Sequence, residues 1–172
     1  MDIQEVKKYL EDNGAKFIHI GIICDDIETT IATLETFPFI GKFTRSTASF
    51  ESKHLEVGAP YVINLAFADL VGHDFVMEIL QPVVEKSDPS NIYSLLLEKY
   101  GNGLSHIAYS VPSMEVFNTA LSVFKNNGYR VILKGQVQPN TMEAIPKGNA
   151  FVYLEPINGS NVFFELLLPS IS

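Results

Sequence analysis

The stretches FIHIGIIC, residues 17–24, and LSHIAYSV, residues 104–111, each place a histidine near the middle of a short apolar segment. These histidines, His19 and His106, lie 87 residues apart. A fixed offset between similar segments indicates an internal duplication, and a duplication determines the architecture of the whole chain, which no single motif does. The same offset relates further identical residues, namely Leu10 and Leu97, Glu11 and Glu98, Gly14 and Gly101, Glu28 and Glu115, and Gly41 and Gly128.

Two glutamates follow the same repeat. Glu78 and Glu165 are also 87 residues apart, so each half of the chain carries a histidine and, 59 residues later, a glutamate. We therefore expect two modules, residues 1 to about 88 and about 89 to 172. The short polar segment 81–89 is too small to separate independent domains, so the modules should form one domain spanning residues 1–172.

Apolar periodicity and turn residues predict the same elements in both halves: a helix, a strand, a second helix and three strands. A four-stranded sheet cannot bury its apolar face alone, so two such sheets should pair and curve around a shared cavity. The predicted fold class is α+β, with two paired βαβββ modules whose curved mixed sheets enclose a metal-binding cavity.

Composition narrows the function classes. The chain of 172 residues carries 12 Lys and Arg against 20 Asp and Glu, a formal charge of -8, so nucleic acid is not an expected partner. Cys24 is the single cysteine, which leaves no disulfide framework. The amino terminus is charged and no apolar run approaches the roughly 18 residues of a membrane span. We expect a cytoplasmic protein without a membrane partner.

Each repeated His and Glu lies among apolar residues of a predicted strand, where burying an ionisable side chain costs free energy. A carboxylate on the apolar face of a sheet needs compensation or a raised pKa. One such histidine alone would be interpreted as a hydrogen-bonded strand residue. Two His-Glu pairs at one offset instead favour a shared divalent metal, held by His19, Glu78, His106 and Glu165. Such a set accepts zinc, nickel, cobalt, manganese or iron, and leaves positions for substrate oxygens.

The sequence resembles the vicinal oxygen chelate superfamily, which contains glyoxalase I, methylmalonyl-CoA epimerase, the bleomycin-resistance proteins and extradiol dioxygenases. The likeness extends over nearly the whole chain and is strongest to the glyoxalase and epimerase branch. It rests on the stretches FIHIGIICDDIETT, VMEILQP, YSLLLEKYGNGLSHIAYSV, LSVFKNNGYRVI and FVYLEPINGSNVFFELL, of which GLSHIAYSV and FFELL are the most specific.

This resemblance implies the same four metal ligands and adds roles. The family stabilises an enolate by binding two vicinal substrate oxygens to its metal, and a glutamate whose pKa burial raises towards neutrality takes the proton. Glu165 is one candidate for this base. Glu56 resembles the epimerase's non-ligand base, although a solvated loop residue is an equally good interpretation. Paired modules in the superfamily close a site within one chain or across two, and we expect a homodimer.

The leading functional hypothesis is a metal-dependent lyase or isomerase, similar to lactoylglutathione lyase or methylmalonyl-CoA epimerase, with a 2-oxoaldehyde adduct or an acyl-CoA as substrate. Arg45 and Arg130 are the only arginines, which is few for glutathione or CoA recognition. The alternative is a non-catalytic small-molecule binder of the drug-resistance type. A ring-cleaving dioxygenase is less expected, because its iron usually has two histidines and one carboxylate as protein ligands.

Overall fold

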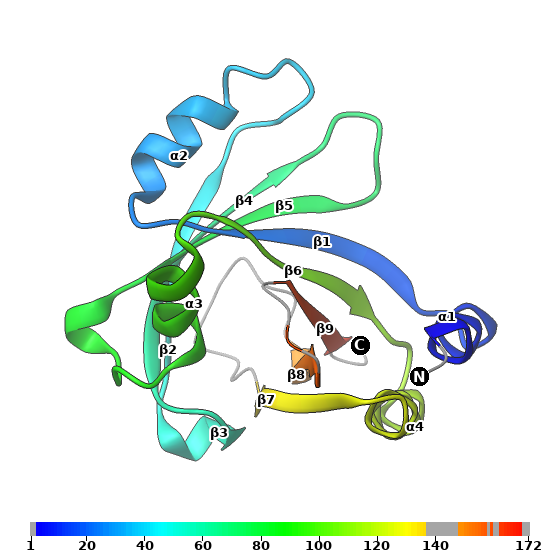
Figure 1. Ribbon diagram of the computed structural model, residues 1–172. Coiled ribbons are helices and arrows are strands. Elements are labelled where there is room, and N and C mark those ends of the chain that lie inside the picture. The colour runs from blue at the N-terminus through cyan, green and yellow to red at the C-terminus, as the bar shows by residue number, and fades with distance from the viewer. Residues whose placement is uncertain (1–2, 137–147, 158, 160–161, 170–172) are drawn as a thin grey trace.

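A computed structural model describes residues 3–136, 148–157, 159 and 162–169. None of the helices in these ranges is long and apolar enough to cross a membrane. In chain order (Figure 1), the elements are α1 (Ile3–Asp12), β1 (Lys16–Ile23), α2 (Ile27–Leu34), β2 (Thr44–Phe50), η1 (Ser52–His54), β3 (Leu55–Val57), β4 (Tyr61–Asp69), β5 (Val76–Pro82), η2 (Val84–Lys86), α3 (Ile92–Tyr100), β6 (Gly103–Ser110), α4 (Met114–Asn126), β7 (Tyr129–Gly135), β8 (Gly148–Pro156) and β9 (Phe163–Pro169).

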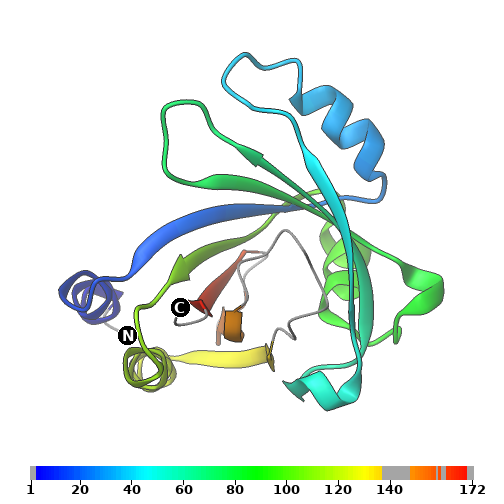
Figure 2. The same cartoon turned by 180° about the vertical axis from the view of Figure 1, so that it is seen from behind.

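The strands form one curled mixed sheet with the order β2-β4-β5-β1-β6-β9-β8-β7-β3. Antiparallel pairing of β1 with β6 joins the two halves of the chain, so the two predicted sheets are a single continuous one. Seen from opposite sides in Figures 1 and 2, this sheet bends into a half-barrel. The predicted α+β class is confirmed.

The duplication is visible in the strand positions. Adding 87 to the bounds of β1, β4 and β5 gives the bounds of β6, β8 and β9. The order β1-α2-β2-β4-β5 in the first half matches β6-α4-β7-β8-β9 in the second, as two βαβββ modules require. The module boundary near residue 88 stays a prediction, since no structural feature at that residue tests it.

Helices α1, α2 and α4 cover the outside of the half-barrel through their apolar sides, whereas α3 packs its buried Tyr93 and Leu96 into the core of the concave face. The α2 helix begins at Asp26, whose side chain accepts hydrogen bonds from the backbone of Glu28 and Thr29. Its buried Ile27 and Ile31 pack on the outer face of β4 and β5. Helices α1 and α4 pack together against the second half of the sheet, where their apolar side chains form a second core.

A short strand that the sequence does not predict links the two edges of the sheet. The chain leaves β2 at one edge, passes through η1 and forms β3, which pairs with β7 near the other edge. Leu55 lies opposite Gly135 in this pairing. The β2–β3 segment therefore helps to enclose the concave face, where the third apolar core lies.

Candidate metal centre

Strands β1 and β6 hold the two repeated histidines side by side. Their antiparallel register places His19 opposite Ala108 and His106 opposite Gly21. The two Nε2 atoms are 2.9 Å apart. His106 is fully buried and His19 is only 7% exposed. The histidines that the sequence paired by offset thus meet within one chain.

The two repeated glutamates flank this histidine pair. Glu165 on β9 places Oε2 3.0 Å from Nε2 of His19 and 3.3 Å from Nε2 of His106. Glu78 on β5 places Oε2 3.0 Å from Nε2 of His106 and 3.4 Å from Nε2 of His19. The structure brings together all four residues predicted as ligands, so one chain can supply the whole set.

The spacing of the donor atoms suits a metal ion. Bonds of about 2.0–2.2 Å at tetrahedral or octahedral angles place neighbouring donors about 2.8–3.6 Å apart. His19, His106 and Glu165 form a group whose donor atoms all lie within 4.8 Å of one another. Glu78 contacts both histidines but does not belong to that compact group, because it approaches from the β5 side and Glu165 from the β9 side.

One buried oxygen of this His–Glu cluster lacks a hydrogen bond. Among the described residues, Oε2 of Glu78 is buried and forms no hydrogen bond of normal geometry, although it lies close to Nε2 of His106. A buried carboxylate oxygen without a hydrogen-bond partner is costly, and a bound cation would satisfy it. Together with the chemistry of the donor set, this orphaned oxygen fits a divalent metal.

Ser105 orients the ring of His106. Its hydroxyl donates to the carbonyl oxygen of Gly21 at 3.0 Å, and its Oγ also lies 3.0 Å from Nδ1 of His106. Because the hydroxyl hydrogen is used on Gly21, Oγ is left to accept a hydrogen from Nδ1. That tautomer leaves the lone pair of Nε2 free to bind a metal, as ligating histidines usually require.

We expect Ser105→Ala to weaken metal binding by about 10- to 100-fold, because the His106 tautomer and ring orientation lose their support. Binding is measured by competition with a chelator of known affinity. Ser110→Ala, on the same strand, is the matched control and should bind as the parent protein does. Equal affinities for the parent and Ser105→Ala would contradict the orienting role.

In the metal-free protein, the cluster is held together by charge. Burial is the largest influence on the pKa of His106 and lowers it, but the close contacts and negative charges of Glu165 and Glu78 outweigh burial and raise the pKa to about 9. Burial raises the pKa of Glu165, yet His106 and His19 more than offset it and lower that pKa to about 2. The expected upward shift of Glu165 is therefore absent in this state, and its carboxylate is ionised.

These shifts predict a pH dependence for metal binding. A metal must displace the proton on His106, so affinity should rise by about tenfold per pH unit up to about pH 9, whereas an ordinary histidine would level off near 6.5. Because the folded-state pKa is raised, the stabilisation that this proton gives the metal-free fold is present below about 6.5 and is lost as the pH rises through about 9. Chelator competition from pH 6 to 9 checks the slope, and a plateau above pH 7 would contradict it.

The His–Glu cluster opens onto a cavity of about 590 Å³ on the concave face of the sheet. His19, Glu78 and Glu165 line it. The rest of the wall is mainly apolar and includes Tyr61, Tyr93 and Tyr153. The sequence did not single out these tyrosines, because none of them has a tyrosine at the repeated position in the other half.

Glu56 lies apart from this cluster. It is on β3, where its side chain is about half exposed and forms an ion pair with Lys134 of β7. It is not among the described residues that line the cavity. The role of Glu56 as a catalytic base stays a prediction, and this geometry does not support it. The alternative interpretation, a solvated surface residue, agrees with the ion pair to Lys134.

Comparison with known proteins identifies the family. A sequence profile of the Glyoxalase/Bleomycin resistance protein/Dioxygenase superfamily matches residues 18–144. The chain belongs to this superfamily. The match covers the first βαβββ module and the β6–α4–β7 part of the second, including GLSHIAYSV, whereas FFELL lies beyond it. It confirms the superfamily resemblance inferred from the sequence. No curated protein matches the superfamily member described here at a significant level.

Solved structures agree on the fold of this superfamily member. Methylmalonyl-CoA epimerase from Mycobacterium tuberculosis is similar with a TM-score of 0.57 and 15% identity, over 90% of this chain and 88% of the epimerase. A variant epimerase from Streptomyces coelicolor, in complex with 2-nitronate-propionyl-CoA, gives 0.53 and 17%, over 91% and 98%. A hypothetical protein from Bacillus halodurans gives 0.58 and 18%, over 92% and 97%. At these identities the likeness extends to the fold alone.

Proposed function

We propose that this chain is a metal-dependent isomerase, epimerase or lyase that binds two vicinal oxygens of a substrate and moves a proton on a neighbouring carbon. The observation that carries the proposal is the buried meeting of two histidines and two glutamates at one wall of the cavity. His19, His106 and Glu165 would hold the metal, with Glu78 completing the set. Zinc, nickel, cobalt and manganese all suit these donors.

Such a metal, when bound, stabilises negative charge that develops on substrate oxygens. The protein's own contribution is to exclude water and to position the substrate against the ligands. The donors are nearly inaccessible, and the wall around them is mostly apolar, which strengthens every electrostatic interaction inside.

The two glutamates are placed to carry protons. Glu165 lines the cavity, where its carboxylate can accept a proton from a carbon next to a carbonyl group. Glu78 lines the same cavity from the opposite side of the histidine pair, since β5 flanks β1 whereas β9 flanks β6. A proton removed on one face of a substrate could thus be returned on the other, as an epimerase needs.

Hydrogen exchange with solvent tests this proposal. The metal-loaded protein is incubated in deuterium oxide with methylmalonyl-CoA, with the methylglyoxal–glutathione adduct or with mandelate, a compact ring-bearing 2-hydroxy acid, and deuterium uptake is followed by mass spectrometry. We expect uptake with at least one of the three substrates, slowed about 1,000-fold or more in Glu165→Gln, which cannot take the proton. Metal-loaded protein that binds these substrates but exchanges no deuterium would contradict catalysis and favour a binding protein.

The homodimer is also a proposal. The superfamily resemblance supports it, while the complete ligand set within one chain means that a dimer is not needed to build the centre. Sedimentation equilibrium of the metal-loaded protein should give about twice the 19.1 kDa chain mass. A monomer mass throughout the concentration range would contradict the homodimer without affecting the metal centre.

A further inference from the structure

Three tyrosines from distant parts of the chain converge in the cavity. Tyr61 lies on β4, Tyr93 on α3 and Tyr153 on β8. The ring centroids of Tyr61 and Tyr93 are 5.0 Å apart, and those of Tyr93 and Tyr153 are 5.9 Å apart. All three residues are at most 4% exposed, yet all line the cavity.

The cluster is next to the candidate metal centre, and on one side of it only. The ring of Tyr153 is 5.0 Å from that of His106, and Tyr153 lies opposite Glu165 in the sheet. In the first module, Phe67 takes the corresponding place opposite Glu78. The difference arises because β8 pairs with β9 one residue out of step with the pairing of β4 and β5, which changes the residue facing inward. The four candidate ligands are thus related by the repeat, whereas Tyr153 beside them has no tyrosine at the corresponding place in the first module.

The tyrosine hydroxyls have a hydrogen to donate. The ring of Tyr93 lies between those of Tyr61 and Tyr153, and each tyrosine has one hydroxyl hydrogen to donate. Hydrogen bonds from Tyr93 to each of its two neighbours would use two of these three hydrogens, which leaves one for another acceptor.

The remaining wall suits a compact apolar body. Phe50 stacks on Tyr61 with centroids 4.8 Å apart and meets Phe151 edge-on at 5.4 Å. Lys42 is the only lysine or arginine among the described residues that line the cavity. A volume of about 590 Å³ is in the range of small-molecule sites. Flat ring faces and aliphatic side chains favour a molecule with a ring or similar carbon-rich body.

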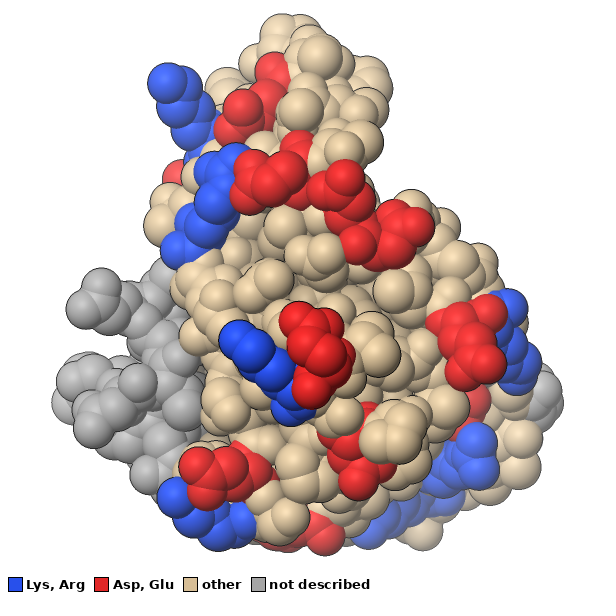
Figure 3. Space-filling model, turned by 90° about the vertical axis from the view of Figure 1, so that its left-hand side faces the viewer, with Lys and Arg blue, Asp and Glu red and all other residues tan. Residues whose placement is uncertain are grey.

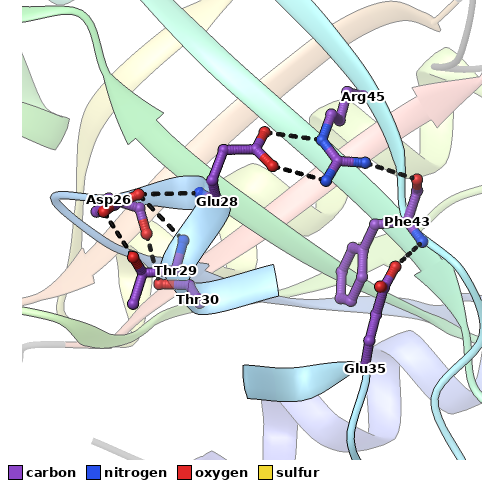
Figure 4. A network of polar contacts seen from close by, with 7 residues as sticks. All are labelled: Asp26, Glu28, Thr29, Thr30, Glu35, Phe43 and Arg45. Atoms are coloured by element: carbon purple, nitrogen blue, oxygen red, sulfur yellow. Dashed lines mark hydrogen bonds and ion pairs between the residues drawn. The ribbon is translucent and has the colours of Figure 1, made fainter. Parts of the chain in front are cut away.

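Both arginines are engaged outside the cavity. Arg45 holds Glu28 through two hydrogen bonds of 2.8 and 2.7 Å (Figure 4), and Arg130 donates to Glu155 at 2.6 Å. On the face shown in Figure 3, basic side chains lie beside acidic ones without forming a basic patch. Nothing in the described part of the chain resembles a cradle for the phosphates of a nucleotide-linked substrate.

From this arrangement we infer that Tyr61, Tyr93 and Tyr153 form a second recognition point, which binds a further oxygen acceptor on a compact, ring-bearing substrate whose vicinal oxygens face the metal. The inference rests on the proposed function and names its substrate class. The cluster would fix which end of the substrate meets Glu165, a choice that the pseudo-symmetric ligands cannot make. These tyrosines are specificity-determining residues for that substrate class.

Hydroxamates, which present two vicinal oxygens, test the inference on the cobalt-loaded protein. The visible spectrum of cobalt first reports whether the metal is bound and then reports each ligand. Acetohydroxamate carries only a methyl group beside the two oxygens, benzohydroxamate carries a phenyl ring, and the 3-acetyl and 4-acetyl derivatives of benzohydroxamate add a carbonyl oxygen to that ring. Relative to their affinities for free cobalt, we expect the ring to tighten binding about 10- to 100-fold. Coenzyme A should not displace benzohydroxamate.

Removing a hydroxyl tests the second recognition point. Tyr93→Phe and Tyr153→Phe should each weaken the better-binding acetyl derivative about 3- to 10-fold and leave benzohydroxamate within twofold. Tyr129→Phe, a tyrosine packed on α4, is the matched control. Three results would overturn the inference but not the metal centre, provided that cobalt binds. They are equal affinities for acetohydroxamate and benzohydroxamate, displacement of benzohydroxamate by coenzyme A, and no selective loss of the acetyl derivative in either Tyr93→Phe or Tyr153→Phe. Failure to bind cobalt would overturn both proposals.

Discussion

His106→Ala is expected to bind a divalent metal at least about 70-fold more weakly than the parent protein. His106 supplies one of four donors, and a fully assembled site in a protein gives about 10–16 kcal/mol, or about 2.5–4 kcal/mol per ligand. The ring is also fully buried. Chelator competition monitored by metal analysis measures the loss.

His73→Ala is the matched control, since His73 is an exposed histidine at the tip of the β4–β5 hairpin. It should bind metal as the parent does. In the metal-free state, His106→Ala should also unfold more easily, by about 3–5 kcal/mol, because Glu78 and Glu165 lose a buried partner. Unchanged metal affinity in His106→Ala would show that the cluster is not the metal centre.

Gly21→Ala is expected to weaken metal binding strongly although it replaces none of the four proposed ligands. Gly21 lies between Glu78 and His106 in the sheet register. A methyl group on Gly21 would lie 1.9 Å from Cε1 of His106 and 2.6 Å from its Nε2, far inside contact distance. The ring must move away, so metal affinity should fall nearly as far as in His106→Ala, with a loss of about 1–3 kcal/mol in stability from overpacking.

The control for this variant is Ala108→Gly, at the repeated position in the other half. Ala108 lies between His19 and Glu165 as Gly21 lies between His106 and Glu78. Removing its methyl group creates no clash, so metal affinity should stay within a few-fold of the parent while stability falls by about 1 kcal/mol. A Gly21→Ala protein that is folded and binds metal as tightly as the parent would contradict the packing argument.

Much of this architecture could be predicted because the duplication gives two independent indications of each strand pair, one in either half of the chain. The offset between His19 and His106 also relates the bounds of β1 and β6, and the offset between Glu78 and Glu165 relates those of β5 and β9. Buried ionisable residues in apolar strands are costly, so their repetition predicted a meeting point. In the structure the two histidines contact each other, and each contacts both glutamates, at 2.9–3.4 Å.

Other features had no signal in the sequence. The orientation of Tyr153 follows from a one-residue difference in register, which apolar alternation cannot reveal in strands buried on both faces. The need for glycine at Gly21 depends on a ring contributed by a neighbouring strand. The three-residue β3 is too short for periodicity to detect. Ser105 looked like an ordinary strand residue until its contact with Nδ1 of His106 was visible.

Metal content tests the central claim most directly. Protein purified without chelator, and then titrated with zinc, nickel, cobalt and manganese, should hold about one ion per chain. His106→Ala and Glu78→Gln, measured alongside, should hold much less. Protein that arrives without metal and takes up none of the four ions would contradict the metal centre and the catalysis proposed for it.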